Sequence, residues 1–129
     1  MAATPIPMTL KTLLASALFA LGAITTAFAE ATWLTNFEEA KALAIKEGKP
    51  LLLDFTGSDW CPPCKALHKS VFSTDEFAKE AAAKYVLVEL DFPKAKPLAP
   101  ELKAQNSELQ KKYAITGYPT VLQIGRAHV

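Results

Sequence analysis

Apolar residues first recur at helical spacing just after residue 36. Phe37, Ala40 and Ala44 are separated by three and four residues, which places them on one face of a helix. This spacing predicts a helix over residues 37–47, and Gly48 is expected to end it.

Three short apolar runs without helical spacing predict buried strands. Residues 51–55 read LLLDF, residues 85–91 read YVLVELD, and residues 120–122 begin a third run after a Gly-Tyr-Pro break. Helices are expected between them, over residues 61–70, 74–84 and 101–112. This alternation predicts an α/β domain in which the first two strands are parallel and joined by a crossover.

The helices between the first two long strands have two predicted details. Cys64, Leu67 and Val71 fall on one face and are expected to point into the protein. Ser73 is followed three residues later by Glu76, which is the pattern of a capping box. Ser73 is therefore predicted to cap the second of these helices.

The N-terminal segment has the pattern of a secretory signal peptide. Residues 13–29 contain no charge, Lys11 precedes them, and the stretch ends in an A-x-A sequence at Ala29. A positive start, a short apolar stretch and a small-residue site predict cleavage near Ala29 and a periplasmic or secreted protein. The alternative is that residues 1–29 are retained as a membrane anchor, although the apolar stretch is short for a spanning helix.

The last seven residues, 123–129, are predicted not to be native. Their sequence, QIGRAHV, resembles a sequencing-library adapter translated in frame, and such tails are excluded from fold reasoning. The expected domain is therefore residues 30–122. A natural C-terminus is the alternative.

Composition and charge exclude several classes of function. The 129 residues suffice for one domain. Fourteen basic and thirteen acidic residues give a net charge of +1, so the basic excess of a nucleic-acid-binding protein is missing. Two cysteines cannot build a multi-disulfide scaffold or a four-cysteine zinc site. Without a metal, nucleotide or flavin motif, no cofactor is expected.

The sequence WCPPC, residues 60–64, stands where a predicted strand and loop lead into a helix. Free N–H groups and the helix dipole at that end favour a thiolate on Cys61, which is therefore the expected nucleophile. Cys64 follows one turn later, close enough for a disulfide. Its inward position predicts that it resolves the mixed disulfide.

Other chemistries of a C-x-x-C pair explain the sequence less well. Haem attachment requires a histidine after the second cysteine, where this chain has Lys65. Zinc binding by Cys61, Cys64 and His68 lacks a fourth native ligand. A structural disulfide across two residues closes a loop too small to constrain the chain much. The pattern therefore favours redox chemistry.

DFTGSDWCPPCK, together with GYPT at residues 117–120, resembles the thioredoxin superfamily over about residues 33–122. The resemblance implies a thioredoxin-like, three-layer α/β/α fold with a mixed sheet, of which this chain lacks the last strand and helix. It also implies a redox-active Cys61–Cys64 disulfide.

The resemblance further assigns a substrate-docking surface. Pro119 matches the family's cis-proline, which packs against the active-site disulfide, and the Tyr118 backbone would pair with an incoming substrate strand. Trp60 matches the aromatic residue before the first cysteine and would form part of this surface. Gly117 would let the substrate approach. A strand-start proline, simple packing of the tryptophan and a turn glycine are the alternatives.

Asp54 matches the family's buried carboxylate behind the second cysteine. A buried acid has a raised pKa, and this one would accept the Cys64 proton during exchange. The chain departs from ordinary thioredoxins by one extra residue between Asp54 and Cys61, and by Glu89 where a basic residue is common. If Glu89 faces Asp54, repulsion should raise the pKa values of the pair further. A strand-end aspartate that points to water is the alternative.

Together these residues predict a secreted thiol–disulfide oxidoreductase. Its partners would be disulfide-containing protein substrates and, by resemblance, a membrane-embedded electron donor. The Pro-Pro pair between the cysteines contains no histidine and favours reduction of substrates, while the direction of electron flow stays open. A non-catalytic peptide-binding module and an inactive fragment are the alternatives.

Overall fold

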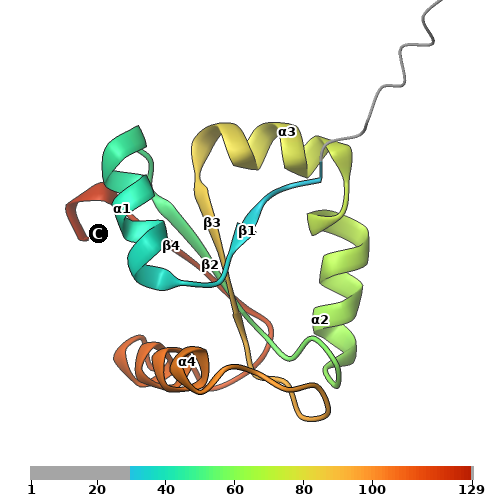
Figure 1. Cartoon of the computed structure of the whole chain (residues 1–129). Helices are drawn as coiled ribbons and strands as arrows, with labels where there is room; N and C mark the ends of the chain where they lie inside the picture. The colour runs from blue at the N-terminus through green and yellow to red at the C-terminus, as the bar shows by residue number, and fades with distance from the viewer. Residues whose placement is uncertain (1–29, 129) are drawn as a thin grey trace, which may run out of the picture.

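A computed structural model describes residues 30–128 of the chain (Figure 1). The predicted signal segment lies outside these residues, as does Val129. The elements are β1 Trp33–Leu34, α1 Phe37–Glu47, β2 Leu51–Thr56, α2 Pro62–Leu67, a π-helical turn His68–Phe72, α3 Asp75–Lys84, β3 Val86–Asp91, α4 Pro100–Lys112, β4 Thr120–Ile124 and a 3-10 turn Arg126–His128.

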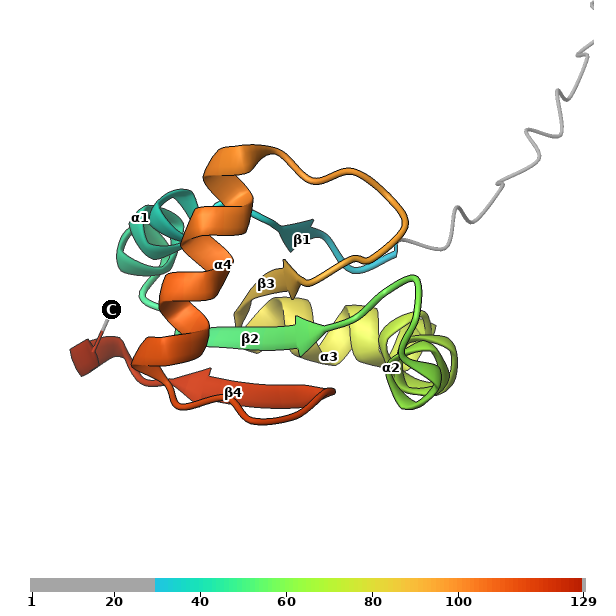
Figure 2. The same ribbon diagram turned by 90° about the horizontal axis from the view of Figure 1, so that it is seen from below.

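The four strands form one mixed sheet in the order β1-β3-β2-β4. β3 is parallel to both β1 and β2, whereas β4 runs antiparallel to β2. Helices α1 and α4 cover one face of the sheet, and α2 and α3 cover the other (Figures 1 and 2). The predicted three-layer α/β fold with a parallel central pair is therefore confirmed.

The main core lies between the sheet and the layer formed by α1 and α4. Alternate residues of the two central strands point into it, and the largest fully buried side chains are Phe55, Leu51, Leu53, Leu90 and Val88. The other residues of β2 and β3, including Asp54, face α2 and α3, because successive strand residues point to opposite faces. Asp54 thus lies on the face of the sheet opposite the main apolar core.

Helix α1 forms as its sequence predicts. The side chain of Asn36 accepts a hydrogen bond from the Glu39 amide, and Phe37, Ala40 and Ala44 are buried. Gly48 ends the helix in the left-handed conformation, with φ of 65°, which glycine adopts without steric cost.

The inward position predicted for Val71 is wrong, because a π-helical turn follows α2. The Ser73 amide bonds to the His68 carbonyl at 2.9 Å, five residues back. This wider turn rotates Phe72 into the protein and leaves Val71 40% exposed. Phe72 packs against Trp33 with ring centroids 4.9 Å apart, so the two-residue strand β1, which was not predicted, helps to hold the turn.

The π-helical turn also moves the predicted helix cap. Thr74, and not Ser73, caps α3 by accepting a hydrogen bond from the Phe77 amide at 3.2 Å. The Ser73 hydroxyl lies 2.9 Å from Nδ1 of His68. The serine is therefore used to hold the turn that precedes the helix.

Strand β4 runs two residues past the predicted domain boundary at 122. Gln123 pairs with Leu52 and Ile124 with Leu51, and Ile124 belongs to the core. That residues 123–129 are not native stays a prediction. Across residues 30–128, no helix is both long and apolar enough to cross a membrane.

Candidate active site

The two cysteines lie where the chain passes from β2 into α2. The Cys61 amide bonds to the Gly57 carbonyl at 2.9 Å, which turns the chain after the strand. Cys61 is then the N-cap of α2, and its Sγ accepts a hydrogen bond from the Cys64 amide at 3.4 Å. Cys61 and Cys64 form a disulfide with their Cα atoms 5.2 Å apart, and each residue is 3% exposed.

Gly57 is required by the close approach of the Trp60 side chain. A Cβ atom added at Gly57 would overlap the Trp60 indole ring. At Gly117, by contrast, nothing lies within 4 Å of an added Cβ.

Gly57→Ala is therefore expected to destabilise the protein by about 1–3 kcal/mol, because Trp60 must leave its position. Denaturant unfolding followed by tryptophan fluorescence measures this. Gly117→Ala is the matched control and should keep wild-type stability. Equal effects of the two substitutions would contradict this account of Gly57.

An aromatic cluster joins the cysteine loop to the start of β4. The rings of Trp60 and Tyr118 are 5.8 Å apart, and those of Phe92 and Tyr118 are 5.2 Å apart. Trp60 also donates a hydrogen bond from Nε1 to the Phe92 carbonyl at 2.7 Å. The Tyr118–Pro119 peptide bond is cis. The structure thus brings together the segments that contain Trp60, Tyr118 and Pro119, whereas Gly117 is exposed.

Asp54 lies behind the disulfide and is only 5% exposed, so the interpretation as a solvent-facing aspartate is wrong. It lines a cavity of about 300 Å³ that Cys64 also lines. Its Oδ1 is buried and has no hydrogen-bond partner. Burial, followed by the charges of Glu89 and Asp91, raises the pKa of Asp54 to about 7. This carboxyl group is thus positioned to exchange a proton near neutral pH.

Glu89 stands opposite Asp54 on the neighbouring strand β3. Burial and the charge of Asp91 raise the pKa of Glu89, while the positive charges of Lys96 and His68 oppose this shift. Both side chains line the same cavity. Their place at this site was not predicted from the sequence, because His68 reaches it through the π-helical turn and Lys96 through a loop without regular structure.

The loop after β3 is tied to the residues that precede Cys61. The Asp59 carboxylate accepts hydrogen bonds from the backbone amides of Lys94, Ala95 and Lys96, at 2.7–3.2 Å. These bonds lower the pKa of Asp59 to about 2. We call this set of contacts, between residues 58–60 and residues 91–96, the clasp.

Ser58 supplies a second contact of the clasp. Its amide and hydroxyl both donate to the Asp91 carboxylate, which Lys96 also approaches at 3.4 Å. With the Trp60 bond to Phe92, three consecutive residues of the cysteine loop hold the loop after β3. No sequence motif predicted the clasp, although Asp59 and Ser58 lie in the segment that is one residue longer than in ordinary thioredoxins.

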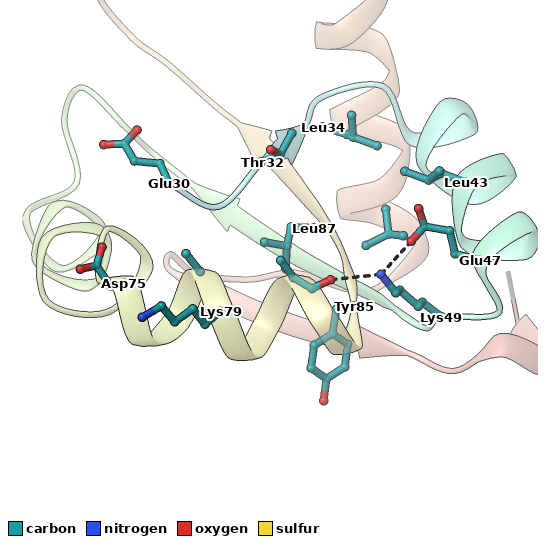
Figure 3. A pocket seen from close by; sticks show the side chains of 13 residues that line it. Glu30, Thr32, Leu34, Leu43, Glu47, Lys49, Asp75, Lys79, Tyr85 and Leu87 are labelled. Carbon is teal, nitrogen blue, oxygen red and sulfur yellow. Dashed lines mark hydrogen bonds and ion pairs between the residues drawn. The ribbon is translucent and has the colours of Figure 1, made fainter. Parts of the chain in front are cut away.

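A larger cavity, of about 740 Å³, lies elsewhere in the molecule (Figure 3). It lies beside α1, α3 and the start of β3, and no cysteine lines it. Lys49 bonds there to Glu47 at 2.8 Å and to the Ala82 carbonyl at 3.1 Å. The charged groups that line this cavity are thus partly paired with one another. The described residues contain no group of three His, Cys, Asp or Glu side chains suited to a metal ion.

Comparisons with known proteins agree on one family. A family model described as thioredoxin-like matches residues 32–125. Thioredoxin-related protein DsbJ of Chlamydia pneumoniae is 33% identical over 90 residues, which cover 70% of this chain and 26% of DsbJ. Disulfide bond reductase DsbH of the same organism is 34% identical over 89 residues, which cover 69% of this chain and 54% of DsbH.

A solved structure extends the similarity to three dimensions. A DsbH oxidoreductase superposes with a TM-score of 0.73 at 32% identity, covering 78% of this chain and 69% of that chain. The chain spans about a quarter of DsbJ and about half of DsbH, the curated relatives reported above.

Proposed function

Because this chain belongs to the thioredoxin-like family, we propose that it is a thiol–disulfide oxidoreductase that reduces disulfides in exported proteins. The observation that carries the proposal is the Cys61–Cys64 disulfide at the start of α2, with the carboxyl group of Asp54 in the cavity behind it. The reductase named DsbH among its relatives supports this direction of electron flow.

The first step of the proposed reaction is carried out by Cys61. In the disulfide form, its sulfur lies at the N-terminus of α2 and accepts the Cys64 amide hydrogen bond. The same position in the reduced protein would favour a thiolate. The thiolate attacks one sulfur of a substrate disulfide. A mixed disulfide forms, and the other substrate sulfur leaves as a thiolate.

Cys64 completes the reaction. It loses its proton to Asp54, whose pKa near 7 suits a general base at neutral pH. The Cys64 thiolate then attacks Cys61 and expels the second substrate sulfur. The substrate gains two electrons, and the Cys61–Cys64 disulfide is restored.

The docking surface of the proposed enzyme is the aromatic cluster beside the disulfide. Trp60 and Tyr118 form its sides, and Gly117 leaves room for the substrate strand. The Tyr118 backbone pairs with that strand, and Pro119 packs against the disulfide. The open space around Gly117 and the contact between the two rings support this assignment.

The proposed location is outside the cytoplasm, after cleavage near Ala29. The A-x-A sequence and the uncharged stretch over residues 13–29 support it. A reductase in an oxidising compartment needs a supply of electrons. A membrane-embedded thiol donor is the proposed source.

The reduction potential of the Cys61–Cys64 pair tests the direction of electron flow. We expect a single two-electron couple near about −270 mV, the value of a thioredoxin-like reductase. Equilibration in glutathione buffers, followed by alkylation and mass spectrometry, measures it, and tryptophan fluorescence reports folding in the same samples. A potential of about −180 to −120 mV would instead indicate an isomerase or an oxidant.

A further inference from the structure

Lys94 is held over the face of Trp60, next to the reactive disulfide. Its Nζ lies 3.9 Å from the centre of the Trp60 ring, a distance at which a cation is attracted by the ring's π electrons. Trp60 directly precedes Cys61 and contacts Tyr118. The ammonium group therefore stands at the edge of the proposed docking surface.

The clasp fixes the backbone from which Lys94 projects. The amide of Lys94 and those of the next two residues all bond to the Asp59 carboxylate. Phe92, two residues before Lys94, accepts the Trp60 indole hydrogen bond and donates its own amide to the Thr56 carbonyl at 2.8 Å. Lys94 is thus a long side chain on an anchored loop, and both ends of the cation–π contact are held.

The charge of Lys94 is not neutralised by an acidic neighbour. Within residues 30–128, its ammonium has no carboxylate partner within 4.0 Å. The nearby acids are already committed: Asp59 to backbone amides, and Asp91 to Ser58 and Lys96. Lys65, on the first turn of α2, is also exposed. Lys94 and Lys65 thus place two positive charges beside the disulfide, whereas the one negative charge of the cysteine loop, on Asp59, is bound by the backbone amides of the Lys94 loop.

We propose that Lys94 is a specificity-determining residue that favours disulfide substrates carrying an acidic side chain beside the reactive cysteine. The inference rests on the proposed oxidoreductase function and names its substrate class. A residue flanking the substrate cysteine passes Trp60 when that cysteine meets Cys61, so its side chain comes within reach of the Lys94 ammonium. Asp59 is the corresponding positioning residue, because it holds the loop without reaching the substrate.

The test uses two peptides with an intramolecular disulfide that differ only in having Asp or Lys beside each cysteine. For each variant, kcat/KM for the Asp peptide is divided by kcat/KM for the Lys peptide, with dithiothreitol as electron source. Comparing this ratio between variants cancels intrinsic differences between the peptides. We expect the wild-type ratio to exceed that of Lys94→Ala by about two- to fivefold at low salt. Lys94→Glu should lower it further, and Lys94→Arg should retain it.

Two more variants separate position from charge. Lys84→Glu makes the same change of charge at the end of α3, at the opposite end of the central strands, and should keep the wild-type ratio. Asp59→Asn also removes a negative charge, which by itself would raise the preference for the Asp peptide. Because the substitution weakens the anchor of Lys94, we expect its ratio to fall instead, towards that of Lys94→Ala; a rise would contradict the positioning role of Asp59. In high salt all ratios should converge, because exposed charges are screened.

The outcomes distinguish this inference from the proposed function. Turnover of both peptides with the same ratio in wild type and Lys94→Glu would overturn the inference and leave the oxidoreductase function intact. No turnover of either peptide by the wild type, together with no defined couple in glutathione buffers, would overturn both.

Discussion

Replacing Cys61 with serine will reduce disulfide exchange to the uncatalysed rate. Serine oxygen cannot replace the thiolate that attacks the substrate, so no mixed disulfide can form. Cys64→Ser will also stop turnover, but one step later. The nucleophile at Cys61 remains, while the thiol that releases the substrate is missing.

Mass spectrometry of each variant after incubation with a disulfide peptide separates the two steps. Cys61→Ser should carry no adduct, whereas Cys64→Ser should carry one peptide bound to Cys61. A pure peptide-binding module would behave differently, because Cys61→Ser would bind peptides as well as the wild type and the wild type would show no turnover. An adduct on Cys64 in the Cys61→Ser protein would reverse the assigned roles.

Asp54→Asn will stabilise the oxidised protein at pH 8 and change its stability little at pH 4. In the folded state the Asp54 pKa is about 7, against an ordinary value of 3.8. The folded state therefore binds the proton more tightly than the unfolded state between these values, and stability falls as the pH rises through this window. Above pH 7, ionisation of Asp54 lowers the free energy of unfolding by on the order of 4 kcal/mol. Asparagine resembles the protonated acid and removes this loss.

Urea unfolding of wild type and variant at the two pH values measures this difference. Glu89→Gln serves as the control. Removing the Glu89 charge should lower the Asp54 pKa and so narrow the pH range over which the stability of the folded protein falls. A stability gain equal at pH 4 and pH 8 would refute the ionisation account. Asp54→Asn should also slow the release of substrate from the mixed disulfide, since Cys64 loses its proton acceptor.

The sequence was informative where one local signal decides the structure. Helix α1 was predicted at its observed limits, because its apolar spacing and terminal glycine agree. The strands of the sheet centre were also predicted, since a run such as LLLDF is compatible with few other environments. Asp54 interrupts the same run, but its burial was expected from its match to the family's buried carboxylate and not from the run alone.

The features that could not be predicted depend on contacts between distant parts of the chain. The exposure of Val71 follows from a π-helical turn whose last residue, Phe72, packs against Trp33 of the distant strand β1. The WCPPC motif identified Cys61 and Cys64, and the thioredoxin resemblance identified Asp54. Neither placed His68 or Lys96 at the cavity, which these two residues reach through irregular backbone. Tertiary packing, and not local propensity, decides such positions.

The contact of the clasp made by Asp59 holds the loop after β3 through main-chain atoms, whatever side chains the loop carries there. Asp59 binds only main-chain N–H groups at positions 94–96, and every amino acid except proline provides one. Prolines stand just outside this window, at positions 93 and 97. Positions 94 and 95 can therefore be varied to any residue except proline while the loop keeps its course, which makes them a natural place to retune the substrate preference of this scaffold.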